Sequence, residues 1–224
     1  MKEQQITDLL IQLPYWNHLT EDEKRQVREQ SSVRHFQAGE LLYGPCVDCT
    51  GMIQILRGEA RAYILSDEGR EVSLFRVEEG DHCVLSASCV LTHISFVSFM
   101  AVTKPSDILI VPVSLFGRLC ENNVHVRCFS YELAARRFSS VVFVMQQILF
   151  ARLDQRLASF LLREYRKSGN TEIRMTHEEL ARDINSVRET VGRMLKRFAE
   201  EGMIENRRGS ILLTDIRKLE DIAK

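Results

Sequence analysis

Short apolar or alternating segments fill the chain between residues 39 and 113, and Gly, Pro and Asp residues separate them. This period of two is typical of β-strands, and several short strands at such spacing favour a sandwich or jelly roll. The predicted strands cover residues 39–43, 52–56, 60–65, 71–77, 97–101 and 108–113. A capping box over Thr20–Glu23 precedes them and predicts a short helix.

The pattern changes at about Val124, and no Gly or Pro interrupts the chain from there to Ala151. Apolar positions now recur at alternating steps of three and four, as in a coiled coil. Two readings stay open: two chains pair along this helix, which we favour, or the helix packs on its own β-domain. The predicted seam comprises Ala134, Arg137, Val141, Val144 and Ile148. Arg137 is its polar exception, which we expect at a frayed end or paired across the seam.

Residues 154–224 predict a small domain of short helices and strands. Asp154 can cap a helix that ends at Ser168–Asn170, and a short strand follows at 173–175. Capping boxes over Thr176–Glu179 and Ser186–Glu189 then predict two helices joined by a short turn. Gly202 ends the second helix, and residues 203–213 predict a hairpin. This order of elements is that of a winged helix-turn-helix.

The predicted fold is therefore α+β and has three parts. Residues 1–123 form a β-roll, or jelly roll, with a short N-terminal helix. Residues 124–153 form a long dimerisation helix, and residues 154–224 form the winged helix-turn-helix.

The second helix of the pair has one apolar and one polar face. The apolar stripe comprises Val187, Val191, Met194, Leu195 and Phe198, and the polar face carries Arg188, Glu189, Gly192, Arg193 and Lys196. In the DNA major groove an Arg can bind guanine O6 and N7, a Glu can accept from cytosine N4, and a Gly allows close approach. The alternative is a solvated amphipathic helix in which Glu189 pairs with Arg193. The short turn and the hairpin favour the DNA-binding reading.

The segment Val187–Lys196 resembles the recognition helix of the CRP/FNR family of bacterial transcription regulators, and residues 176–185 resemble the helix before it. The resemblance extends to the turns at Gly58 and Gly80-Asp81 and to the long helix. It implies a homodimeric regulator with a cyclic-nucleotide-binding-like β-roll. It also implies that Arg188 and Glu189 read base edges, with Arg193 on a base or a phosphate. The predicted DNA-binding residues are Thr176, Ser186, Arg188, Glu189, Thr190, Gly192, Arg193, Lys196, Arg207 and Arg208.

The sensor region departs from the members of this family that bind cyclic AMP. Those members place a Glu and an Arg after the Gly-Asp turn, for the ribose and the cyclic phosphate, whereas no Arg or Lys occurs here between Arg76 and Lys104. A buried phosphate needs a cation, so we do not expect cyclic AMP. A neutral or apolar ligand, a cofactor such as haem, or no ligand remains open. The predicted effector pocket comprises His82, Cys83, Ser86, Ser88 and Cys89.

The chain has six cysteines, and Cys46 and Cys49 form a C-x-x-C, a spacing used by metal and redox sites. Cys83 and Cys89 are chemical candidates for completing a zinc or iron–sulfur site, and His82 and His93 for binding haem iron. Buried structural thiols are the favoured reading because free Cys commonly packs in cores. Haem, an iron–sulfur cluster and zinc stay open as cofactors.

Two parts of the chain differ in net charge. The whole chain has 30 basic and 31 acidic residues, a net charge of -1. Residues 1–150 hold 14 basic and 18 acidic side chains, and residues 151–224 hold 16 and 13, which gives balances of -4 and +3. Positive charge thus gathers in the predicted DNA-binding part, and we expect DNA affinity with a moderate salt dependence.

Two observations bear on location. Residues 83–103 carry no Asp, Glu, Lys or Arg, but their Ser, Thr and β-branched residues favour buried strands over a membrane span. The N-terminal residues lack the apolar core of a secretory signal, so we expect a cytoplasmic protein with no membrane partner.

The leading hypothesis is a homodimeric, effector-responsive regulator that binds a palindromic operator in double-stranded DNA, with RNA polymerase as a further partner. A metal-dependent cupin-like enzyme is the second hypothesis. It needs converging His and Glu ligands, whereas the six histidines here are scattered singly. A ligand-independent protein-binding module is the third hypothesis.

Overall fold

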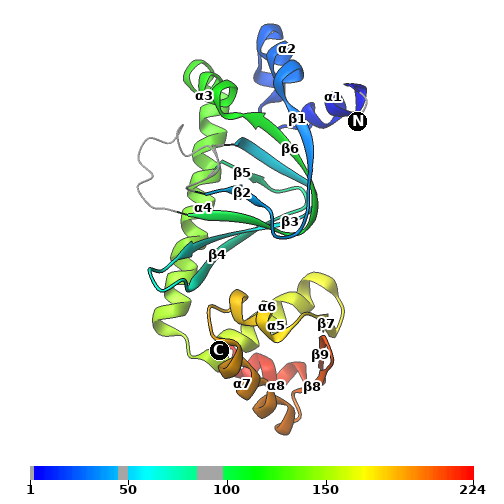
Figure 1. Cartoon of the computed structure of the whole chain (residues 1–224), viewed down its shortest axis with the longest axis vertical. Helices are drawn as coiled ribbons and strands as arrows, with labels where there is room; N and C mark the ends of the chain where they lie inside the picture. Colours follow the sequence, from blue (N-terminus) through cyan, green and yellow to red (C-terminus); the bar gives the residue numbers. More distant parts are fainter. Residues whose placement is uncertain (1–2, 45–49, 85–97) are drawn as a thin grey trace. The chain divides into compact units, whose positions relative to one another are not determined.

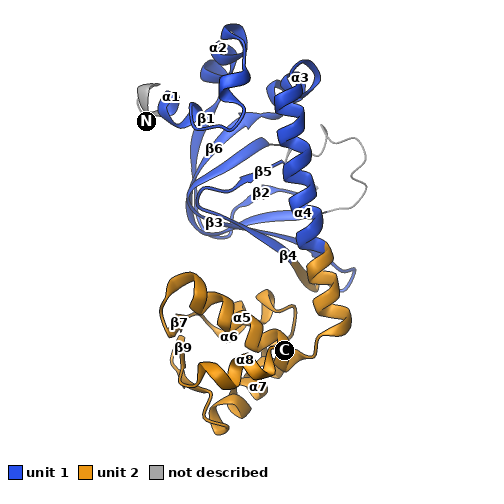
Figure 2. Ribbon diagram, turned by 180° about the vertical axis from the view of Figure 1, so that it is seen from behind, with its two compact units in different colours: residues 1–68, 74–141 blue, residues 69–73, 142–224 orange. Residues whose placement is uncertain are grey.

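The computed structural model describes residues 3–44, 50–84 and 98–224 of the chain. The chain forms two compact units: residues 1–68 and 74–141 make up the first, and residues 69–73 and 142–224 the second (Figure 2). The predicted α+β class, with an N-terminal sheet and a C-terminal helix-turn-helix, is confirmed. No helix in the described part of the chain is long and apolar enough to span a bilayer.

The first unit is built on a six-stranded sheet (Figure 1). Its path is β1-β6-β3-β4, with β2 paired to β6 and β5 paired to β3. The elements are α1 (Glu3–Leu10), the 3-10 helix η1 (Trp16–His18), α2 (Glu21–Gln30), β1 (Ser32–Phe36), β2 (Leu41–Tyr43), β3 (Gly51–Leu65), β4 (Glu71–Glu78), β5 (His82–Cys83), β6 (Phe99–Pro112), α3 (Val113–Asn122) and α4 (Val124–Phe150). The start of β4, residues 71–73, and the end of α4, residues 142–150, belong to the second unit. The predicted capping box is confirmed, because Thr20 Oγ1 accepts a hydrogen bond from the Glu23 N–H at 3.2 Å.

Two pairs of predicted strands are each one continuous strand. β3 runs through Gly58, and β6 runs through Pro105, where the sequence pattern predicted breaks. The two strands pair with each other, and shifts of register between Ile55 and Ala60 absorb the irregularity. Gly58 has a φ of +97°, and a Cβ at that position would collide with Ser106. The glycine thus serves a bulge within a strand and does not end one.

The first half of α4 packs on the first unit. Val126, Phe129 and Leu133 are buried in the same apolar cluster as Trp16 and Phe116. Arg137, predicted on the heptad seam, also turns toward this unit: its Nη2 donates to the His82 carbonyl oxygen at 2.9 Å. Arg137 therefore lies inside the helix and not at a frayed end, and its pairing across the seam stays a prediction.

The second unit is smaller and has its own core. Its elements are α5 (Leu153–Ser168), β7 (Glu172–Arg174), α6 (His177–Asp183), α7 (Arg188–Glu200), β8 (Ile204–Arg207), β9 (Ser210–Leu213) and α8 (Ile216–Ile222). The strands form a sheet in the order β7-β9-β8. Leu157, Leu161, Leu195 and Phe198 are buried at the centre of the core. The predicted hairpin is confirmed, and α8 was not predicted.

Two helix starts differ from the sequence prediction. The helix that Ser186 was predicted to cap begins at Arg188, and its N-cap is Val187, with no side-chain capping bond. The Ser186 N–H instead donates to the Ala181 carbonyl at 2.8 Å, as part of the turn. Asp154 lies inside the first turn of α5, which begins at Leu153. Val187, predicted in the buried stripe, is 55% exposed.

Candidate DNA-binding surface

A short turn joins α6 to α7, and hydrogen bonds fix its conformation. The N-cap of α6 is Thr176, whose Oγ1 accepts from the Glu179 N–H at 3.2 Å while Glu179 Oε2 accepts from the Thr176 N–H at 2.7 Å. Asn185 in the turn has a φ of +52°, the only positive φ among the described residues other than Gly. Its side chain accepts from the Ser73 N–H at 2.7 Å and donates to the Ser73 carbonyl at 3.1 Å, and Ser73 belongs to the same unit. These bonds fix the turn and hence the start of α7.

The polar face of α7 points outward. Arg188, Glu189, Arg193 and Lys196 are exposed, whereas Val191, Leu195 and Phe198 are buried in the core below. Thr190 is partly buried, and its Oγ1 lies 3.5 Å from Arg193 Nη2. The helix therefore presents charged side chains on a rigid support.

Gly192 lies on this same face. A Cβ built there would meet only His177 Nδ1, at 3.8 Å, within 4 Å. The protein's own packing thus leaves room for a side chain. Because Gly192 has no side chain, another molecule can approach the backbone of α7 closely at this position.

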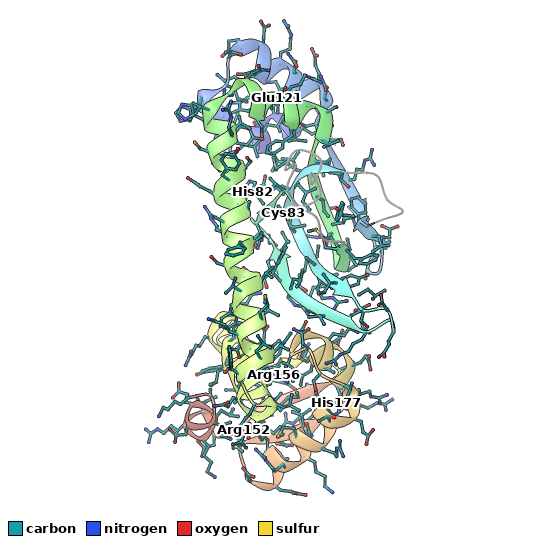
Figure 3. All side chains as sticks on the ribbon, turned by 90° about the vertical axis from the view of Figure 1, so that its left-hand side faces the viewer. His82, Cys83, Glu121, Arg152, Arg156 and His177 are labelled. Carbon is teal, nitrogen blue, oxygen red and sulfur yellow. The ribbon has the colours of Figure 1, made fainter. Side chains whose placement is uncertain are left out.

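A hollow of about 410 Å³ joins the start of α7 to the hairpin. Thr176, Arg188, Arg207 and Arg208 line it, so the fold brings together four residues that the sequence analysis assigned to DNA. His177 also lines the hollow and was not predicted (Figure 3). It follows the N-cap of α6, and no sequence signal separated it from an ordinary first-turn residue. Ser186 is half-buried in the turn and does not line the hollow.

The two arginines of the hairpin differ in their surroundings. Arg207 Nε and Nη2 donate to the Glu205 carboxylate at 3.1 and 3.0 Å. This pairing raises the pKa of Arg207 and lowers the pKa of Glu205. Arg208 is exposed and has no ion pair among the described residues. A phosphate would therefore bind Arg208 directly but compete with Glu205 for Arg207.

A cluster of charged side chains holds α7 against α5. Arg197 Nη2 on α7 lies 3.2 Å from Asp154 Oδ2, and Arg152 Nη2 lies 3.0 Å from the same oxygen. The Gln155 N–H donates to Asp154 Oδ1 at 3.0 Å. Burial alone would raise the pKa of Asp154, but the hydrogen bonds from Arg197 and Gln155 outweigh it and hold the pKa below its usual value. The cluster joins α5 to α7.

Replacing Asp154 by Asn should lower the free energy of unfolding of the second unit at pH 7 by about 1–2 kcal/mol, because two guanidinium groups lose their anion. A carboxyl with a lowered folded-state pKa stabilises the protein above its ordinary pKa of about 3.8 and loses that effect as the pH falls through the folded-state value. The difference between wild type and variant, measured by denaturant unfolding, should therefore vanish in acid.

The exposed Asp221 provides the control for this variant, since its replacement by Asn should change the free energy of unfolding by less than about 0.5 kcal/mol. A constant difference between Asp154→Asn and wild type from neutral to acid pH would show that the charge of Asp154 has no part in stability.

The predicted effector pocket is only partly within the described residues, since Ser86, Ser88 and Cys89 lie outside them. So do Cys46, Cys49 and His93. His82 and Cys83 form β5, and they point to different surroundings: Cys83 is buried in the core of the sheet, and His82 lies beside α4. The structure therefore does not place these two side chains in one pocket.

The basic residues that bracket the uncharged segment are both engaged. Arg76 and Lys104 each pair with the buried carboxylate of Glu59, Lys104 Nζ at 3.0 Å. Arg61 is also buried, and its guanidinium carbon lies 4.5 Å from the centroid of the Tyr63 ring. Among the described residues, no group of three or more His, Cys, Asp or Glu side chains could hold a metal ion.

Comparisons with known proteins agree with this arrangement. Residues 155–222 match the Crp-like helix-turn-helix domain family. The transcriptional regulator SdrP of Thermus thermophilus is 33% identical over 86 residues, which are 36% of this chain and 43% of SdrP. The chain thus spans less than half the length of that relative.

Solved structures extend the match to nearly the whole chain. A regulator from Eubacterium rectale assigned to the CRP/FNR family is 36% identical with a TM-score of 0.88, over 94% of this chain and 98% of that one. FixK2 of Bradyrhizobium japonicum shares the fold, with 18% identity and a TM-score of 0.70 over 87% of this chain and 98% of its own. The matches support a regulator and give no support to a cupin-like enzyme. The chain is a member of the CRP/FNR family of transcription regulators, with a helix-turn-helix DNA-binding domain at residues 155–222.

Proposed function

We propose that the protein is a homodimeric transcription regulator that binds a palindromic operator in double-stranded DNA and responds to an effector other than cyclic AMP. The observation that carries the proposal is the outward face of α7, where exposed Arg188 and Glu189 adjoin a hollow shared with Arg207 and Arg208. Residues of these types match the donor and acceptor pattern of the major groove.

The residues divide into two roles. Arg188 and Glu189 read base edges, with Arg193 on a base or a phosphate, and Gly192 allows close approach. The remaining predicted residues contact phosphates or fix the turn: Thr176, Ser186, Thr190, Lys196, Arg207 and Arg208. RNA polymerase is the further partner that we propose.

The homodimer proposal is supported by an exposed apolar stripe on α4. Tyr131, Phe138 and Leu149 are 60%, 70% and 67% exposed, and Met145 is 54% exposed. Together with Ala135 and Val142 they recur at alternating steps of four and three, which is a heptad seam. Soluble proteins rarely leave such a stripe in contact with water, and a second copy of α4 would cover it.

This stripe lies about 100° around the helix from the seam predicted from the sequence, at 100° for each residue. The predicted seam, Ala134 to Ile148, lies between the stripe and the face that packs on the first unit. We therefore assign the dimer contact to the stripe, with Ala134, Val141, Val144 and Ile148 at its edge. Residues 124–153 then serve as the dimerisation helix, between a sensor at 1–123 and a DNA-binding domain at 154–224.

The pairing of charged side chains supports the proposal that the effector is not cyclic AMP. Arg76 and Lys104 are both engaged with Glu59, so neither is free for the cyclic phosphate of a nucleotide bound in the sheet. Haem, an iron–sulfur cluster and zinc remain candidate cofactors. An absorption spectrum and the metal content of anaerobically purified protein distinguish these cofactors from an organic effector.

Selection from a pool of random double-stranded DNA tests the function. We expect enrichment of an inverted repeat whose half-site centres are about one helical turn apart, because two recognition helices in a twofold dimer face the same side of the duplex. Enrichment of single half-sites would contradict the dimer, and failure to enrich any sequence would favour a protein-binding module.

A further inference from the structure

His177 lies in the hollow that joins the start of α7 to the hairpin (Figure 3). It is the first residue of α6, and its side chain is half-buried, so part of the imidazole stays open to water. All residues that line this hollow belong to the second unit. A molecule that occupies the hollow therefore meets the imidazole.

A second observation places the imidazole at the outward face of α7. A Cβ built on Gly192 would lie 3.8 Å from His177 Nδ1, and no other side chain of the described residues comes within 4 Å of it. Gly192 is on the polar face of α7, where another molecule can approach the helix backbone closely. His177 Nδ1 thus lies next to the point of closest approach.

The charge around the imidazole is mainly positive. The charged residues that share the lining are Glu178 of α6, Arg188 of α7, and Arg207 and Arg208 of the hairpin. Two of these four are paired: Arg207 with Glu205, and Glu178 with Arg182 at 3.9 Å. Arg188 and Arg208 have no ion pair among the described residues. The charges that remain unpaired in the hollow are therefore positive, and they favour an anion.

A histidine adds a cation that depends on pH. It is the side chain that ordinarily changes its charge between pH 5 and 8. The neutral imidazole donates one hydrogen, whereas the protonated form donates two and carries a positive charge. A phosphate oxygen only accepts, and it binds a charged donor more strongly than a neutral one. A phosphate in the hollow therefore favours the protonated form.

We propose that His177 contacts a DNA phosphate and links DNA binding to protonation, so that each bound recognition helix takes up as much as one proton on the His177 imidazole. This inference deepens the proposed function and rests on it. Because linkage is reciprocal, a fall in pH strengthens DNA binding by the same factor by which DNA favours protonation. Acidification thus raises the occupancy of the operator without an effector.

Fluorescence anisotropy of the full chain with the selected operator, from pH 8 to pH 6 at constant salt, tests the proposal. We expect the affinity for each half-site to rise about threefold to tenfold as the pH falls over this range, and about 10–100-fold for a dimer. Random duplex DNA should show the same relative change, because a phosphate contact carries no sequence information.

The salt dependence is a second readout, which a purely structural role of His177 would not change. One more phosphate contact for each half-site should steepen the slope of log affinity against log salt concentration. The expected increase from pH 8 to pH 6 is about 0.9 for each half-site and about 1.8 for a dimer.

Three variants connect both readouts to His177. His177→Gln keeps a hydrogen-bond donor but cannot become charged, so its affinity and its salt slope should not change between pH 8 and pH 6. His177→Arg is charged throughout and should bind at pH 8 about as tightly as wild type binds at pH 6. His35→Gln removes an exposed histidine of β1 in the first unit, and this matched control should keep the pH dependence of wild type. Unfolding midpoints show that each variant is folded.

Two results would overturn the proposal. One is the same pH dependence for His177→Gln and wild type. The other is a pH effect on the operator alone and not on random DNA, because it would assign His177 to a base edge. If wild type bound no duplex at any pH in this range, that result would instead contradict the proposed function.

Discussion

Replacing Arg188 by Ala should weaken operator binding by about 1–3 kcal/mol for each half-site, and by about twice that for a dimer on a palindrome. Arg188 is exposed at the first position of α7, where its guanidinium can bind the O6 and N7 of a guanine. Selectivity should fall with affinity, because a base contact adds free energy only on the correct sequence. Fluorescence anisotropy with the selected operator, with single-base variants of it and with random DNA measures both effects.

Arg207→Ala is the matched control for this loss of selectivity. Arg207 lies on the hairpin and is assigned to a phosphate, so its loss should weaken binding to all sequences alike. The effect should be small, because Arg207 leaves Glu205 to reach a phosphate. Equal operator affinity and selectivity for Arg188→Ala and wild type would show that Arg188 does not read a base.

Replacing Phe138 by Glu should separate the dimer into single chains at micromolar concentration. In a dimer the two Phe138 side chains would face each other across the seam. Two carboxylates there would be buried without partners and would repel each other, which costs several kcal/mol. Operator affinity should then fall by about 10²–10⁴-fold, because the second recognition helix is no longer held next to the DNA. Light scattering gives the mass, and anisotropy gives the affinity.

Gln147→Glu adds the same charge on the opposite side of α4 and is the control for this experiment. It should leave the mass of two chains and the operator affinity unchanged. A Phe138→Glu protein that keeps the mass of a dimer would place the contact between chains on another surface.

Local signals predicted most of the elements. The capping boxes at Thr20 and Thr176 are satisfied by residues three positions away, so the sequence alone identifies them. Gly58 and Pro105 were read as strand breaks because nothing local reveals that β3 and β6 run beside each other through both positions. The predicted cap at Ser186 failed for a related reason, since the left-handed backbone at Asn185 lengthens the turn and moves the helix start to Arg188.

The face of α4 that contacts a second chain was harder to predict than the helix itself. The helix has one apolar face toward its own unit and another toward solvent, and both repeat at steps of three and four. Periodicity cannot separate two such faces, and only contacts such as that of Arg137 with His82 do so. On the DNA-binding surface, Arg188, Arg207 and Arg208 were predictable from residue type. The support of α7 by Asp154 and Arg197 was not, because those residues lie far apart in sequence.

The separate core of the DNA-binding domain has an evolutionary consequence. Leu157, Leu161, Leu195 and Phe198 pack with one another and not with the core of the first unit. A recombination event that joins residues 153–224 to an unrelated sensor would therefore leave this core complete. Such a chimera would keep its operator if the new sensor also supplied the hydrogen bonds that Ser73 makes with Asn185, and gene fusion would then be a route by which regulators of this type acquire new inputs.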